Sequence, residues 1–326
     1  MGGGAISDDF LTVHLAVIQP ATLVPADLYI RTEDDAPFVL YRAAKTPFTE
    51  EARQRLLEHG VAALHLHRSH EDAYRQYVEE NMAAIVRDDL LPPEETCRLV
   101  YESSSRVMED LFEDPRSGRN ILRAHAMVEP MVLSIMKEPD SLWDIASLAA
   151  HDYYTYTHSV NVSLFLIATG REILGIDGMS QLKEVGFGGL LHDVGKSRIP
   201  EEILRKRGSL TEQESVLVRE HPMAGLEIVR RHHRLSPTSR AIIRSHHESY
   251  DGTGYPDGIR GAAIPQVAGL AKIIDVYDAL TTERPYANAR SPFDAMELMG
   301  RMTGHFDVGM LRLFVRFLGP KEPGQG

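Results

Sequence analysis

Cysteine is almost absent from this chain of 326 residues. Cys97 is the single one, so the chain can form neither a disulfide framework nor a thiolate zinc cluster. Long apolar runs are also missing, and none approaches the roughly 18 residues that a membrane-spanning helix needs. The first residues, MGGGAISDDF, contain neither the basic nor the apolar region of a signal peptide. These absences predict a cytoplasmic protein that does not enter a membrane.

The chain also lacks an excess of basic residues. It has 35 lysines and arginines against 47 aspartates and glutamates, for a net charge of −12. A field of this sign disfavours long nucleic acid, and a phosphate-bearing ligand would need a local positive site such as a metal. Internal repeats are absent. The length suggests about two domains of ordinary globular composition.

Residues 10–68 combine short β-rich runs with one helical segment. The runs are VHLAVIQP, DLYIRT, PFVLYRA and VAALHLHR, broken by Pro, Asp and Glu. Between the last two, TPFTEEARQRLLEHG predicts a helix that Thr49 caps and Gly60 ends. The pattern predicts a small α+β regulatory or sensory module over residues 1–70.

From about residue 70 the hydrophobic period becomes helical. We expect a helical linker over residues 71–140, although ordinary bundle helices would give the same pattern. An all-α bundle of about seven helices fits residues 141–320. Within it, Thr211 and Glu214 form the T-x-x-E pattern of a capping box, and Asp307 is a candidate N-cap of the last helix.

Histidine is concentrated in one part of the chain. Eight of the fifteen histidines fall between residues 151 and 251. Neutral imidazole is a frequent metal ligand, so the clustering indicates a metal site, although a single helical histidine is usually a surface or core residue. The segment RRHHR at 230–234 predicts a solvated basic helix end. We therefore do not count its histidines, or His151, among the candidates.

His192 and Asp193 follow the apolar stretch GFGGLL. Burying such a pair is costly unless both groups are paired or coordinated. The two residues could hold one metal together, or Asp193 could bridge two metals. A plain helix C-cap at Gly195 is the alternative interpretation.

Further candidate ligands lie on other helical segments: His158, His221, His246, His247 and Asp275. With His192 and Asp193 they supply five imidazoles and two carboxylates. Such a set is too large for one tetrahedral ion and suits two octahedral ions bridged by a carboxylate.

Five motifs occur in one order that resembles a known family. They are HD at 192–193 followed by VGK, HP at 221–222, HHE at 246–248, DGTGYP at 251–256 and DVYDALTTERPY at 275–286. Residues 145–315 thereby resemble the HD-GYP subgroup of the HD-domain metal-dependent phosphohydrolases. The resemblance implies an all-α HD-GYP catalytic domain over residues 141–320. It also implies a phosphodiesterase that hydrolyses cyclic di-GMP to pGpG, and in some members onward to GMP.

The resemblance also implies roles for individual residues. The seven candidate ligands correspond to the family's metal ligands, with Asp193 as the bridging carboxylate that takes part in catalysis. Lys196 and Arg284 correspond to contacts to substrate phosphate, and Lys196 is expected to take part in catalysis as well. Gly254, Tyr255 and Pro256 form the GYP signature, in which Tyr255 is expected to contact substrate. Two divalent ions are expected, iron or manganese in preference to nickel, cobalt, zinc or magnesium.

Two positions depart from the family pattern. Tyr154 stands where some members have a glutamate that recruits a third metal, so we expect a two-metal site. Ala287 stands where a lysine is common, which would remove one phosphate contact. A weakly active or inactive cyclic-di-GMP-binding signalling module therefore stays open, as does an HD phosphohydrolase that acts on another cyclic dinucleotide. A homodimer and a signalling partner at the GYP segment also stay open.

The stretch SHHESYDGTGYPDG at 245–258 is expected to divide into a metal-binding helix end and a rigid turn. Gly252, Gly254 and Gly258 are predicted to adopt positive φ in that turn. Glu248 either orients one of the neighbouring rings or is exposed to solvent.

Overall fold

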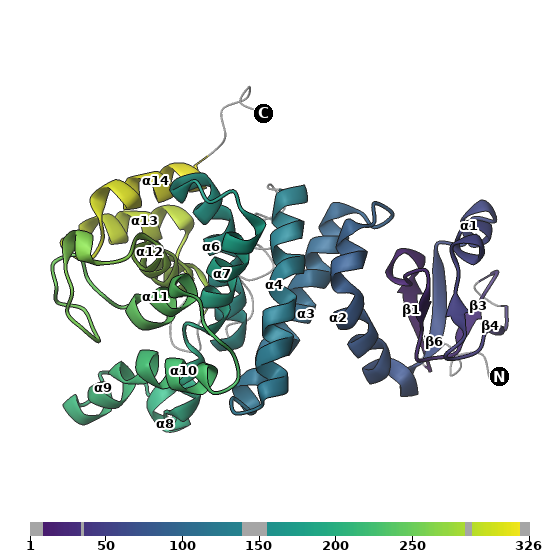
Figure 1. The fold of residues 1–326 in the computed structure, drawn as a ribbon, viewed down its shortest axis with the longest axis horizontal. Helices are drawn as coiled ribbons and strands as arrows, with labels where there is room; N and C mark the ends of the chain where they lie inside the picture. The colour runs from purple at the N-terminus through teal and green to yellow at the C-terminus, as the bar shows by residue number, and fades with distance from the viewer. Residues whose placement is uncertain (1–8, 34–35, 139–154, 284–288, 320–326) are drawn as a thin grey trace. The chain divides into compact units, whose positions relative to one another are not determined.

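The computed structural model describes residues 9–33, 36–138, 155–283 and 289–319 (Figure 1). The chain forms two compact units, Met1–Thr96 and Cys97–Gly326. The division at residues 70 and 140 that we expect from the sequence stays a prediction. Among the described residues, no helix is both long enough and apolar enough to cross a membrane.

The first unit contains an antiparallel four-stranded sheet in the order β1-β6-β3-β4. A two-stranded sheet, the helices α1 and α2, and two short 3₁₀ helices complete this unit. The elements are β1 (Phe10–His14), η1 (Leu15–Val17), β2 (Thr22–Leu23), β3 (Leu28–Ile30), β4 (Val39–Arg42), β5 (Pro47–Phe48), α1 (Glu50–Glu58), β6 (Ala63–His67), η2 (Arg68–His70) and α2 (Glu71–Arg87).

The predicted α+β character of this unit is confirmed, with local differences. Thr49 caps α1 by accepting a hydrogen bond from the Ala52 amide, as the sequence indicates. The run VHLAVIQP is extended only as far as His14 and then turns into η1, whose three residues are buried. The two-residue strands β2 and β5 are too short to leave a period-2 pattern in the sequence.

The second unit is helical, which confirms the predicted all-α bundle. Its elements are α3 (Pro93–Glu113), α4 (Gly118–Lys137), α6 (Thr155–Leu174), α7 (Met179–Leu191), η3 (Val194–Arg198), α8 (Glu201–Leu204), α9 (Glu212–Arg219), α10 (His221–Arg230), α11 (Pro237–Ser245), η4 (Gly261–Ala263), α12 (Gln266–Thr281), α13 (Pro292–Arg301) and α14 (Val308–Leu318). The described part of residues 141–320 thus holds nine α-helices rather than about seven. Part of the excess arises because Glu220 separates α9 from α10.

Three glycines in α7 let its neighbours approach closely. A Cβ at Gly189 would lie 2.7 Å from the Ser163 Cα in α6, and one at Gly188 would lie 3.0 Å from the Ser239 Cα in α11. A Cβ at Gly186 would meet side chains of α4 and α6. Helix α7 is therefore the centre of the unit and lies beside α6 and α11 (Figure 1). This packing brings the C-terminal end of α7, where the HD motif begins, into the interior.

Local start signals in the sequence are confirmed at two further helices. Thr211 and Glu214 form the predicted capping box of α9, with both reciprocal hydrogen bonds present. Asp307 caps α14 by accepting from the Met310 amide. Cys97 is buried in the second unit, with its Sγ 3.1 Å from the Ser134 Oγ.

Candidate metal centre

The structure gathers all seven candidate ligands into two adjoining groups. Within each group the ligand atoms lie no more than 4.8 Å from one another. The first group, cluster A, consists of Asp193, His221, His246 and His247; the second, cluster B, consists of His158, His192 and Asp275. These residues come from five separate helices or helix ends between α6 and α12, so the tertiary fold, not local sequence, brings them together.

Three of the histidines follow a helix C-terminus and are oriented by it. The Nδ1 of His192 lies 2.7 Å from the Gly189 carbonyl oxygen at the end of α7. His221 makes the same contact, at 2.7 Å, with the Val218 carbonyl at the end of α9. His246 Nδ1 lies 3.1 Å from the carbonyls of Ile242 and Ile243 in the last turn of α11. Carbonyls in the last turn of a helix have spare capacity to accept hydrogen bonds, and each ring uses this capacity.

This orientation fixes which ring nitrogen faces the centre. A carbonyl oxygen accepts hydrogen bonds only, so the Nδ1 atoms of His192, His221 and His246 carry the proton. Each ring therefore directs its Nε2 inward. The other nitrogen of a metal-bound histidine typically makes such a hydrogen bond.

Several nitrogen and oxygen atoms face the centre without a hydrogen-bond donor in the described part of the chain, which is an environment that suits a cation. The Nε2 atoms of His221 and His246 lie only 3.2 Å apart, and both face the centre. Among the described residues, His192 Nε2 and Asp193 Oδ1 are buried without a hydrogen-bond partner. Buried polar atoms without partners are costly, and a bound cation would satisfy all four. The donor set therefore fits divalent metal ions.

The Asp193 carboxylate lies between the two clusters. Its Oδ1 is 3.3 Å from His221 Nε2 and 3.8 Å from His246 Nε2 in cluster A. Its Oδ2 is 3.4 Å from His192 Nε2 and 3.7 Å from His158 Nε2 in cluster B. One oxygen thus faces each group, which is the arrangement that a bridging carboxylate requires.

Asp275 spans the clusters as well, which the sequence analysis did not anticipate. Its Oδ1 lies 3.0 Å from His158 Nε2 and 4.0 Å from His192 Nε2. Its Oδ2 lies 4.0 Å from His247 Nδ1. Two carboxylates, at the start of η3 and in α12, therefore connect clusters A and B.

Burial and charge set the protonation of the centre. Burial lowers the pKa of His247 to about 3, with Asp275 partly opposing the shift. Burial and the neighbouring rings of His247 and His192 lower the pKa of His246 well below its usual value. Burial raises the pKa of Asp193, but Lys196 and His192 lower it by more. The net pKa is well below its usual value, so the carboxylate is ionised. Neutral imidazoles and ionised carboxylates are the protonation states that bind metals.

Asp278 and Asn161 support the centre, and the sequence analysis missed both. Asp278 Oδ2 lies 2.7 Å from His158 Nδ1, and its Oδ1 accepts a 2.9 Å hydrogen bond from Asn161 Nδ2. Asp278 therefore orients the His158 ring, as helix carbonyls orient the rings of the three histidines that follow a helix C-terminus. The available signal was its position three residues after Asp275 in an apolar helix, which places both carboxylates on one face.

Lys196 lies at the edge of the centre. Its ammonium donates a hydrogen bond to Asp193 Oδ2, and its side chain is 22% exposed. Nearby, Gly195 allows a close approach of two elements, because a Cβ there would lie 1.9 Å from the His221 carbonyl oxygen. The HD and HP motifs are thus in direct backbone contact.

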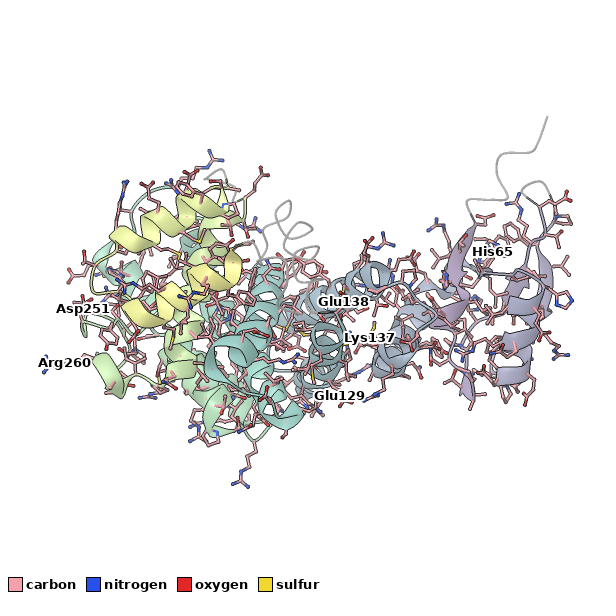
Figure 2. All side chains as sticks on the ribbon, turned by 90° about the horizontal axis from the view of Figure 1, so that it is seen from above. His65, Glu129, Lys137, Glu138, Asp251 and Arg260 are labelled. Atoms are coloured by element: carbon pink, nitrogen blue, oxygen red, sulfur yellow. The ribbon has the colours of Figure 1, made fainter. Side chains whose placement is uncertain are left out.

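The GYP segment covers one side of His247. The Tyr255 ring stacks on the His247 ring with centroids 4.7 Å apart and an interplanar angle of 22°. The Arg219 guanidinium lies over Tyr255, 5.5 Å from the ring centroid. The Tyr255–Pro256 peptide bond is cis. The loop that carries the segment, between α11 and α12, also bears Asp251 and Arg260 (Figure 2).

The glycines of this loop serve two different purposes. Gly252 and Gly258 adopt positive φ, at +85° and +64°, as predicted. The prediction is wrong for Gly254, whose role is close packing, because a Cβ there would lie 2.2 Å from the Ser249 amide nitrogen. Glu248 is buried and neither orients a ring nor faces solvent; its Oε1 accepts a 2.7 Å hydrogen bond from the Asp257 amide.

Three sequence-based expectations lie outside the described residues. These concern Arg284 as a phosphate contact, Tyr154 in place of a third-metal glutamate, and Ala287 in place of a lysine.

Comparison with known proteins places this geometry in a family. Residues 144–309 match the family model described as HD domain. Cyclic di-GMP phosphodiesterase PA4108 of Pseudomonas aeruginosa is 36% identical over 223 residues, which cover 68% of this chain and 53% of that protein. A probable cyclic di-GMP phosphodiesterase of Vibrio cholerae is 38% identical over 231 residues, which cover 65% and 52% of the two chains.

Other relatives carry a different substrate in their names. The 3'3'-cGAMP-specific phosphodiesterase 1 of Vibrio cholerae is 35% identical over 173 residues, covering 51% of this chain and 38% of that protein. At most, the matched region covers about half the length of these relatives.

A solved structure has the same fold along almost the whole chain. Bd1817, described as an HDG"Y"P protein from Bdellovibrio bacteriovorus, superposes with a TM-score of 0.64 at 22% identity, covering 95% of this chain and 99% of that one. The chain therefore belongs to the HD-domain family and is homologous to the HD-GYP cyclic di-GMP phosphodiesterases.

Proposed function

We propose that this chain is a metal-dependent phosphodiesterase that hydrolyses cyclic di-GMP to pGpG. The observation that carries the proposal is the Asp193 carboxylate, which directs one oxygen at each of two imidazole-rich clusters. A carboxylate in this position can hold two cations close together, as two-metal phosphodiester hydrolysis requires.

In this proposal each cluster holds one divalent ion. Cluster A and cluster B supply imidazole and carboxylate ligands without sulfur, a set that suits iron or manganese and also nickel, cobalt, zinc or magnesium. When bound, the pair of ions would supply a strongly nucleophilic water at neutral pH and neutralise charge on the phosphodiester. The proposed site has two ions and no third.

The chain's own side chains then bind and orient the substrate. Lys196 lies at the edge of the centre with a partly exposed side chain, so it is placed to attract a phosphate oxygen as negative charge develops. Tyr255 lies beside the centre with its ring between His247 and Arg219, and its edge and hydroxyl are proposed to contact the substrate. Arg284 is proposed as a second phosphate contact from the segment that follows α12.

A second substrate has support from the relatives. Proteins named as 3'3'-cGAMP-specific phosphodiesterases match this chain at 33–38% identity, close to the values for relatives named for cyclic di-GMP. The two cyclic dinucleotides differ in one base and share the phosphodiester that the clusters would engage. The further steps to GMP, regulation by the N-terminal module, a homodimer and a signalling partner at the GYP segment belong to the same proposal.

The decisive experiment compares products and metal content in matched variants. Purified protein loaded with manganese or iron is expected to convert cyclic di-GMP to linear pGpG. Asp193→Asn and His192→Ala are expected to lose bound metal and turnover together, since both remove inward-facing ligand atoms. Asp177→Asn, an exposed position on the same domain, serves as the control.

The outcome also separates the candidate substrates. Faster cleavage of 3'3'-cGAMP than of cyclic di-GMP would favour the second candidate. Unchanged metal content and turnover in both site variants would contradict the proposed centre. Metal binding without a linear product from either dinucleotide would leave a binding module in place of an enzyme.

A further inference from the structure

A basic groove lies on the surface of the helical unit, apart from the metal centre. Its volume is about 1110 Å³, and it is formed by the end of η3, α10, the turn after α10, and α11. None of the seven candidate metal ligands lines it. Its arginines are Arg198, Arg230, Arg231, Arg234, Arg240 and Arg244.

The charge of this groove is opposite to that of the whole chain. Six arginines and two glutamates line it, which gives a formal charge of +4 with its two histidines neutral, whereas the chain carries −12. The segment RRHHR supplies much of the groove. We expect a solvated helix end there, and the structure places His233 half-buried against Phe187 while the arginines on either side are exposed.

Only three of the six arginines in the groove form ion pairs with a carboxylate that the structure describes. Arg198 and Arg231 share the Glu227 carboxylate, and Arg244 makes two hydrogen bonds, of 2.7 and 2.8 Å, to Asp257. Arg230, Arg234 and Arg240 are exposed, and no described carboxylate pairs with them. Guanidinium groups gathered in one concavity repel one another unless an anion lies between them.

The chemistry of the lining narrows the kind of anion. The planar guanidinium fork matches phosphate oxygens in a two-point hydrogen bond, and several forks favour a group with several phosphate charges. Met223, Leu226 and Leu235 add apolar surface within the same groove, against which a base could pack. The volume is sufficient for a small molecule of nucleotide size.

We propose that this groove binds a diphosphate- or triphosphate-bearing small molecule, at a site separate from the metal centre. Arg230, Arg234 and Arg240 bind the phosphates, and Arg198, Arg231 and Arg244 are held in place at the rim by their carboxylate partners. The proposal does not depend on the catalytic activity proposed for the chain.

Titration calorimetry on the chelator-treated full chain tests the site with inorganic pyrophosphate and, separately, with GDP. The variant Arg230→Ala/Arg234→Ala/Arg240→Ala is expected to weaken binding about tenfold or more, since three charge-assisted hydrogen-bonding groups are removed. Arg312→Ala, an exposed arginine of α14, is expected to leave binding unchanged. Arg234→Lys, which keeps the charge but not the fork, is expected to have an intermediate effect.

Several results would overturn the proposal. Equal affinity of the triple variant and the unaltered chain would do so, as would loss of binding in Asp193→Asn alone, which would assign the phosphate to the metal clusters. A poly-glutamate peptide that binds as tightly as either probe would assign the groove to an acidic protein segment. Tighter binding of GDP than of pyrophosphate would support a nucleotide, and equal binding would support the phosphate group itself. The melting temperature of each variant checks that the exposed substitutions leave the fold intact.

Discussion

Asp278 controls the metal centre through another residue. It contributes no atom to clusters A and B, but it fixes the ring of His158, whose Nε2 lies between Asp275 and Asp193. Asn161 in turn holds the other oxygen of Asp278. A ring with a fixed tautomer and direction gives up less freedom when it binds an ion.

The change Asp278→Ala should therefore weaken metal binding by roughly 10–100-fold, because outer partners of metal-bound histidines typically contribute that much. Asp278→Asn keeps an oxygen that can accept from His158 and should recover much of the loss. Metal affinity measured with a competing chelator gives the readout, with Asp177→Ala as the control. Equal affinity in Asp278→Ala and the unaltered chain would mean that His158 needs no such support.

For single residues, the sequence motifs identify the candidate metal ligands but do not indicate which other residues each ligand contacts. The seven candidate ligands could be selected from the sequence because motif order and residue type identify them. The spanning role of Asp275 depends on contacts with His158, His192 and His247 on three other helices or helix ends, and the partner of His158 lies 120 residues away in the chain. Spacing alone cannot supply those contacts. Gly254 and Glu248 show the same limit, since their neighbours come from tertiary packing.

Among the elements, η3 and α10 show how backbone contact positions the centre. Asp193 immediately precedes η3 and His221 begins α10, and the two elements touch where Gly195 faces the His221 carbonyl. The contact leaves no room for a side chain at Gly195. The distance between Asp193 and His221 therefore depends on this glycine.

We expect Gly195→Ala to lower the free energy of unfolding by about 1–3 kcal/mol or more, since overpacking forces the backbone apart. It should also weaken metal binding, because Asp193 and His221 move with their elements. Gly269→Ala is the matched control, since a Cβ there would meet only Met310 Sδ at an ordinary 3.7 Å. Calorimetric melting and metal affinity of the two variants check this. A Gly195→Ala protein that melts like the control would contradict the close contact.

Among the elements, the starts of helices are predicted best from the sequence, because their signal lies within a few residues. The capping residues Thr49, Thr211 and Asp307 start their helices as expected, because a cap bonds to the chain three residues away. The strands β2 and β5 are not predicted from the sequence, since two residues are too few to show a period.

For the whole molecule, the buried centre makes stability depend on pH. Burial lowers the pKa of His246 and His247, so these rings stay neutral in the folded state while the unfolded chain takes up protons below about pH 6.5. The unfolded state then binds more protons, so stability falls as pH decreases from about 6.5 toward about 3, the folded pKa of His247.

Chelator-treated protein should therefore show a lower melting temperature at about pH 5 than at about pH 7. The variant His247→Gln should show a smaller decrease, because one of the two shifted groups is removed. His232→Gln, an exposed histidine outside the clusters, should behave like the unaltered chain. A melting temperature that is constant over this range, or an unchanged decrease in His247→Gln, would show that the rings do not control the acid response.

The ends of α7 and α11 have an electrostatic consequence for the order of binding. Both helices present their C-terminus to the centre, and the C-terminal end of a helix macrodipole carries about half a negative charge. At His221 the C-terminus of α9 meets the N-terminus of α10, so their partial charges offset each other. Two negative helix ends and two ionised carboxylates therefore converge on one small volume. The field favours cations and repels phosphate, even with Lys196 nearby. We therefore expect the cyclic dinucleotide to bind only after the metals, with metal-free protein showing no measurable affinity for it at this centre.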